Sequence, residues 1–98
     1  MPAERTSEKQ PMNLQTYLVS REHVFSIGIE TDSGQHYLSF PVGNRLVDYE
    51  EYYRIDADDF ARYLRDMGSA LEFVERCRRR QMDHLLLVAP GNDRGSAL

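Results

Sequence analysis

The densest group of reactive side chains lies between residues 47 and 60, where carboxylates and tyrosines are interleaved. Six carboxylates and one arginine give this stretch a formal charge of −5. Paired carboxylates can serve as general acid and base, but catalysis requires burial that separates their pKa values, and so dense a run is more often a solvated face. The stretch is therefore better suited to recognition of another molecule than to catalysis.

An acidic surface that carries tyrosines is typical of a protein-binding site. Tyrosine is enriched at protein interfaces, and carboxylates steer a basic partner toward the surface. We predict that six consecutive side chains project outward from a sheet margin and bind a basic protein. The alternative is structural: a charged edge strand, whose charges discourage aggregation, runs into a well-capped helix. The predicted partner-binding residues are Asp48, Tyr49, Glu50, Glu51, Tyr52 and Tyr53.

Histidine, cysteine and serine occur without the spacing that metal or catalytic sites need. His23, His36 and His84 lack metal-ligand spacing, so no metal site is predicted. The single cysteine, Cys77, excludes an internal disulfide. Neighbouring arginines could lower its pKa, although packing on the inner face of a helix is the favoured interpretation. No phosphate-binding loop, nucleophile elbow or triad motif is present, and we predict no catalytic residues, no cofactor and no enzymatic activity.

The net charge of −4 conceals a separation of charge along the chain. Residues 48–59 carry −5, whereas residues 60–80 carry +3, from six arginines against three carboxylates. The arginines at 76 and 78–80 complement the dipole at the end of a helix, and no glycine or aromatic residue is interleaved with them. The expected partner is therefore a basic protein and not a nucleic acid.

Length and composition predict one globular domain. Ninety-eight residues can bury one modest core, and 41% hydrophobic with 29% charged residues is ordinary for a globular protein. The N-terminal residues carry charges of both signs without an apolar run, and no segment approaches the ~18 apolar residues of a membrane helix. With a single cysteine, these features predict a cytoplasmic protein that does not bind membranes. The predicted divisions are a disordered leader at 1–13, a domain at 14–88 and a flexible tail at 89–98.

Alternation of apolar and polar residues predicts an antiparallel meander of strands. The clearest hairpin surrounds Asp32-Ser33-Gly34, because glycine can supply the positive φ of a short loop. Gly43-Asn44 predicts a second, two-residue turn. Glu51 interrupts an otherwise aromatic row in the strand that follows, which indicates an edge strand. The four expected strands span 14–20, 24–31, 37–42 and 46–53.

Helix signals follow the acidic stretch. Asp56 is a natural N-cap for a helix over 57–66. Gly68 is expected to end that helix in a left-handed conformation, and the capping-box sequence 69–72 predicts the start of a second helix. The apolar run 84–88 suits either a helical extension or a last strand, and we favour a strand covered on both faces.

These elements predict an α+β fold: an antiparallel sheet of about four strands, with room for a fifth C-terminal strand, covered on one face by two helices. Three functions are compatible with it. The first is a small non-enzymatic protein-binding module, such as a bacterial immunity protein or antitoxin that uses its acidic edge against a basic partner. The second is a homo-oligomer that pairs through a strand edge. The third is a small ligand-binding or enzymatic domain. The expected state in solution is a monomer or a homodimer.

Overall fold

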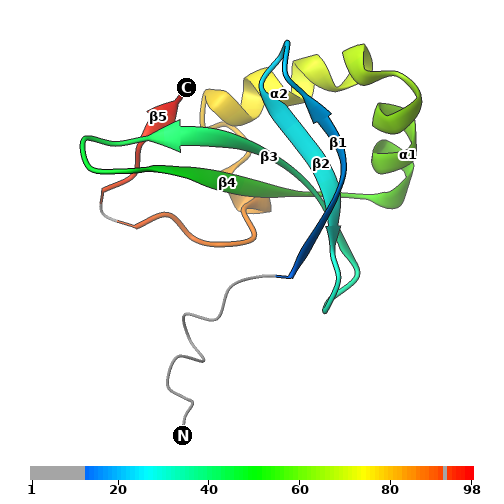
Figure 1. Cartoon of the computed structure of the whole chain (residues 1–98), viewed down its shortest axis with the longest axis horizontal. Helices are drawn as coiled ribbons and strands as arrows, with labels where there is room; N and C mark the ends of the chain where they lie inside the picture. The colour runs from blue at the N-terminus through cyan, green and yellow to red at the C-terminus, as the bar shows by residue number, and fades with distance from the viewer. Residues whose placement is uncertain (1–12, 92) are drawn as a thin grey trace, which may run out of the picture.

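Four antiparallel strands, connected in sequence order, form most of the five-stranded sheet of this α+β protein, as predicted (Figure 1). The structure is a computed structural model and describes residues 13–91 and 93–98. The order β1-β2-β3-β4 follows from the two hairpin loops and from the short turn after β1. The strands are β1 (Leu14–Ser20), β2 (Phe25–Glu30), β3 (Gln35–Gly43) and β4 (Asp48–Ile55).

The two hairpin loops are built by different residues. Gly34 takes a φ of +73° in the β2–β3 loop, which confirms the prediction for that turn. In the β3–β4 loop, Asn44 Oδ1 accepts hydrogen bonds from the backbone N–H groups of Leu46 (2.7 Å) and Val47 (2.9 Å). The loop is therefore longer than the predicted two-residue turn, and β4 begins at Asp48.

The first helix begins at the capping residue that the sequence indicates, whereas the second helix does not. Asp56 accepts a hydrogen bond from the N–H of Asp59 at 2.7 Å and starts α1 (Ala57–Arg65). The break after α1 differs from the prediction, because the extended residue is Asp66 and Gly68 lies in a 3₁₀ turn, η2 (Met67–Ala70). That turn runs directly into α2 (Leu71–Arg78), so no capping box forms.

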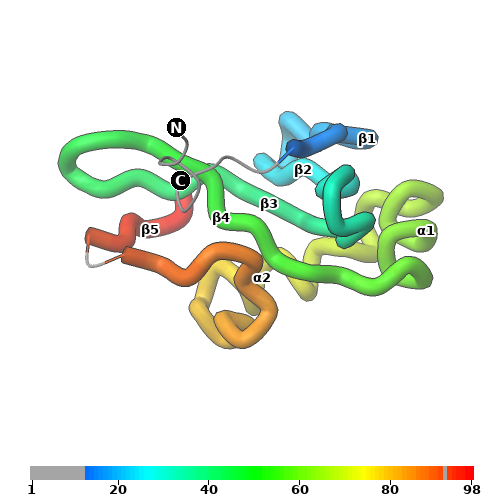
Figure 2. The backbone as a smooth tube through the Cα atoms, turned by 90° about the horizontal axis from the view of Figure 1, so that it is seen from below, coloured from blue at the N-terminus to red at the C-terminus, as the bar shows by residue number. Residues whose placement is uncertain are grey.

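The core lies between the sheet and α2, on what we call the inner face. Figure 2 shows α2 beneath the sheet and α1 at one end of it. Alternate residues of β2, β3 and β4 point to this face, and the inner side of α2 meets them. The main buried residues are Phe25, Ile27, Leu38, Phe40, Val42, Tyr53, Ile55, Tyr63, Ala70, Val74 and Cys77.

The outer face of the sheet is partly buried as well. Tyr37 points away from the core, on the side of β3 opposite Leu38 and Phe40, yet its side chain is buried. Its ring crosses Gly28 of the neighbouring strand, and its hydroxyl lies 3.2 Å from the hydroxyl of Thr16 on β1. The ring of Tyr52 packs edge-on against it from β4, at 5.4 Å between centroids. The central strand β3 is therefore covered on both sides.

The C-terminal part of the chain departs most from prediction. The run at 84–88 is not a strand: a 3₁₀ turn, η3 (Asp83–Leu85), is followed by a single bridge between Leu86 and Tyr53. The fifth strand is instead β5 (Ser96–Ala97), which pairs with β3 at Val42 and Gly43. The end of the predicted tail is thus hydrogen-bonded to the sheet, because β2 stops short of this part of β3 and leaves its edge open.

The predicted leader lies outside the described residues except for Asn13. The N–H of Asn13 donates to Glu30 Oε2 at 3.1 Å, and its carbonyl accepts from the N–H of Thr31 at 2.8 Å. In the described part of the chain, none of the helices has the length and apolar character needed to cross a bilayer.

Candidate functional site at the edge of β4

Strand alternation divides the six predicted partner-binding residues between two faces. Asp48 and Glu50 are exposed on the outer face, and Tyr52 is half-buried beside them. Tyr49, Glu51 and Tyr53 point to the inner face, where Tyr53 is 0% and Glu51 7% exposed. The expectation that all six side chains project from the sheet margin is therefore wrong for Glu51 and Tyr53.

Glu51 and Tyr53 belong to a buried polar cluster centred on Arg94. The Arg94 side chain is 12% exposed, and its Nε donates to Glu51 Oε2 at 2.8 Å. Its Nη1 and Nη2 donate to the two carboxylate oxygens of Asp83 at 2.7 and 2.9 Å. Tyr53 Oη donates to Glu51 Oε1 at 2.9 Å. Arg94 thus neutralises two carboxylates and ties the C-terminal segment to β4.

The ionisation of this cluster follows from its contacts. Burial and the hydrogen bond with Glu51 raise the pKa of Tyr53, so the phenol stays protonated in the fold. The hydrogen bond from Arg94 lowers the pKa of Asp83 below its usual value. The same bonds raise the pKa of Arg94, which remains a cation. The cluster is a satisfied ion triad and has no free acid or base for catalysis.

Cys77, on the same inner face, gives the fold an alkaline limit. Burial raises the pKa of its thiol to about 12 from 9.0. The pKa of the thiol is higher in the folded than in the unfolded state. The buried thiol of Cys77 therefore makes its full contribution to the free energy of unfolding below pH 9, and this contribution is lost progressively above pH 9. We expect stability to decline from about pH 9 upward, and the slope in Cys77→Ala to be shallower by up to about 1.4 kcal/mol per pH unit. Urea unfolding at several pH values measures this, and parallel profiles for the two proteins would contradict it.

The neighbouring arginines do not make Cys77 reactive. They could have lowered the pKa of its thiol, but burial raises that pKa instead. Arg78 instead donates to the carbonyl of His23 at 2.6 Å, and Arg76 pairs with Glu72 at 3.1 Å. Among residues 13–91 and 93–98, no three histidine, cysteine, aspartate or glutamate side chains converge into a possible metal site.

The outer edge of β4 carries backbone groups that no strand of the described chain pairs. The N–H of Leu87 donates to the carbonyl of Tyr52 at 2.9 Å, which shows that Tyr52 turns its backbone away from β3. Alternate residues turn the same way, so the N–H and C=O of Glu50 also point to this edge. Beyond the bridge at Leu86, no pairing covers the edge at Asp48 and Glu50 within the described residues.

A groove runs along this open edge. It has a volume of about 460 Å³ and lies between residues 49–52 of β4 and the segment 88–91. Asp93 also lines the groove and is exposed, as are Asp48 and Glu50 nearby. Tyr49 is another lining residue, and its hydroxyl accepts a hydrogen bond from the N–H of Gly95 at 2.7 Å. The candidate site is therefore a strand edge with an acidic border and a groove beside it.

Comparisons of the chain with protein-family models, with curated proteins and with solved structures found no match. The function is therefore inferred from the geometry of the β4 edge. Sequence reasoning located this edge but missed its second wall, the segment 88–91, because nothing in that segment indicates where it packs.

Proposed function

We propose that this protein is a non-enzymatic binding module that recognises a basic protein through the outer edge of β4. The observation that carries the proposal is the unpaired backbone of Glu50, bordered by exposed carboxylates and by a groove. Such an edge can accept one extended segment of a partner as an additional strand, with main-chain hydrogen bonds providing affinity.

The charge at the edge selects the partner. Asp48 and Glu50 are exposed and lack an arginine partner among the described residues, whereas Glu51 is neutralised by Arg94. The negative charge available for recognition therefore comes from Asp48, Glu50 and Asp93, and not from the whole acidic stretch. Arginine or lysine side chains on a paired strand would lie next to these carboxylates, which favours basic segments and speeds their association.

The class of protein that fits these features is a small acidic inhibitor of a basic protein. Its 98 residues, its net charge of −4 and its acidic edge suit a bacterial immunity protein or antitoxin that covers a basic toxin. We place it in the cytoplasm as part of the same proposal, since the sequence has one cysteine and no disulfide to maintain.

Selection from a displayed library of random peptides tests the proposal on the full chain. We expect the enriched peptides to be β-prone and rich in arginine or lysine. In NMR spectra of the protein, the backbone amide signals of β4 should change when such a peptide binds. Glu50→Lys is expected to abolish this enrichment, because it reverses the charge at the centre of the edge. The matched control is Glu72→Lys on the exposed side of α2, which should select the same peptides as the wild type.

Four outcomes would overturn the proposal. They are a library that yields no enriched peptide, enrichment of peptides without basic residues, equal enrichment by the Glu50→Lys variant, and spectral changes confined to the helices.

A second candidate function is self-association through β1. This strand contains no charged residue, its outer edge has no partner within residues 13–91 and 93–98, and Tyr17 and Val19 on it are exposed. Uncharged edge strands are prone to pair with a copy of themselves. Sedimentation at micromolar concentration decides the question, since a strict monomer excludes this candidate.

A further inference from the structure

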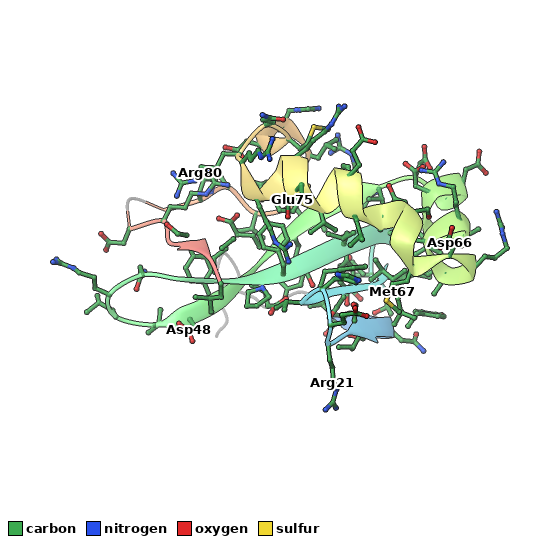
Figure 3. The ribbon with its side chains drawn as sticks, turned by 90° about the horizontal axis from the view of Figure 1, so that it is seen from above. Arg21, Asp48, Asp66, Met67, Glu75 and Arg80 are labelled. Carbon is green, nitrogen blue, oxygen red and sulfur yellow. The ribbon has the colours of Figure 1, made fainter. Side chains whose placement is uncertain are left out.

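A second hollow adjoins the groove and shares one residue with it. It has a volume of about 320 Å³ and lies on the outer face of the sheet, where β1, β2 and β3 meet. Glu50 borders both hollows, so the acidic edge continues onto this face. Figure 3 shows Arg21, which lines the hollow, and Asp48 of the acidic edge on the side of the sheet away from α2.

Small residues form the floor of the hollow and apolar residues form its rim. Ser20 and Ser26 line the hollow, and neither side chain is large enough to fill the space above the sheet. Val19 is 57% and Val24 39% exposed, and the half-buried Pro41 completes the rim. The result is a surface depression lined by aliphatic side chains, with Glu50 and Arg21 as its charged lining residues.

Val24 has a strained backbone that keeps its side chain at this rim. Its φ is +60°, a left-handed conformation that is unfavourable for a β-branched residue. The fold maintains it with a hydrogen bond from the N–H of Val24 to the carbonyl of Ser20 at 2.9 Å. Arg78 reinforces the turn from α2 by donating to the carbonyls of His23 and Val24 at 2.6 and 3.2 Å.

Valine is not the residue type best suited to this backbone conformation. Asparagine adopts a positive φ more readily than valine and would be solvated at the same place. Strained residues that a fold holds in place often contribute to binding or catalysis. The hydrogen bonds of the turn account for its backbone conformation, but they do not explain why residue 24 carries an exposed isopropyl group.

We infer that the hollow receives a bulky apolar side chain of the partner, adjacent to the basic side chain that Glu50 attracts. This inference rests on the proposed function, and it makes the recognised segment amphipathic: one cation at the β4 edge and one aliphatic or aromatic anchor on the outer face. An apolar anchor in a desolvated pocket, with charged contacts around it, is the arrangement that dominates affinity at protein interfaces.

The peptide selection, repeated with Val24→Asn in the full chain, tests this inference. The wild type is expected to select peptides with a large apolar residue at a fixed distance from a basic one. Peptides selected by Val24→Asn should still contain the basic residue but no longer the apolar one. The variant should also bind the best wild-type peptide about tenfold more weakly by calorimetry. Its melting temperature should be equal to or higher than that of the wild type, because asparagine relieves strain. Leu64→Asn, an equally exposed apolar residue on α1, is the control and should bind normally.

The outcomes separate this inference from the proposed function. Basic peptides without a fixed apolar position, or unchanged binding by Val24→Asn, overturn the apolar anchor and leave the β4 edge intact. A selection without basic peptides overturns both. A lower melting temperature for Val24→Asn would show that valine is there for stability, and it too would overturn the inference.

Discussion

Replacing Arg94 with methionine is expected to lower the free energy of unfolding by about 3–5 kcal/mol. Methionine keeps most of the length of the side chain but removes the cation that neutralises Glu51 and Asp83. Glu51 is 7% exposed and would be left as a buried carboxylate with only the phenol of Tyr53 as partner. Removing one member of a buried ion pair costs more than the pair itself contributes, because the remaining charge has lost its hydration without compensation.

Urea unfolding at neutral pH measures this loss, and two further variants identify its cause. Arg79→Met removes an exposed arginine from the end of α2 and should change stability by less than about 0.5 kcal/mol. Combining Arg94→Met with Glu51→Leu should restore much of the lost stability, since the isolated buried carboxylate is then absent. If the double variant were as unstable as Arg94→Met, the loss would come from packing of the C-terminal segment and not from the unpaired charge.

Local signals in the sequence were sufficient for most of the sheet and for the start of α1. The alternation of residues 24–31 and the loop glycine at 34 define a hairpin by themselves, because side-chain direction and loop conformation depend on neighbouring residues only. Asp56 caps α1 for the same reason. The error at Gly68 has a physical basis: a chain that stays in a 3₁₀ turn between two helices needs neither a left-handed glycine nor a capping box.

The candidate site could be predicted only in part, because its partners are distant in the sequence. Glu51 interrupts the aromatic row of β4, and this irregularity predicts an edge strand. β4 is an edge strand, but the buried ion pair that Glu51 forms with Arg94 is not indicated by the pattern. Arg94 lies 43 residues away and has no neighbouring pattern that would place it on the inner face. Alternation alone did separate Glu50 from Glu51, and applying it strictly would have restricted the exposed set to the outer row.

Gly28→Ala is the second substitution with a large expected effect, because it introduces a methyl group where two strands and a ring already meet. A Cβ at residue 28 would lie 2.2 Å from the backbone carbonyl oxygen of Gln15 and 2.7 Å from the hydroxyl of Tyr37. Rotation of a side chain cannot relieve the first contact, so β1 must move away from β2. We expect a loss of about 3 kcal/mol in the free energy of unfolding, at the upper end of the range for overpacking.

The matched control is Gly91→Ala, where a Cβ meets no atom within 4 Å, and which should change stability by less than about 0.5 kcal/mol. Equal stability of the two variants in urea would contradict the close packing of Tyr37 over Gly28. The effect should also reach the proposed site, since the ring of Tyr37 supports that of Tyr52 at 5.4 Å. Displacement of Tyr37 would change the chemical shifts of Tyr52. We then expect Gly28→Ala to bind the selected peptides more weakly. Because this substitution leaves the charge of Glu50 unchanged, the weaker binding would come from disorder of the site.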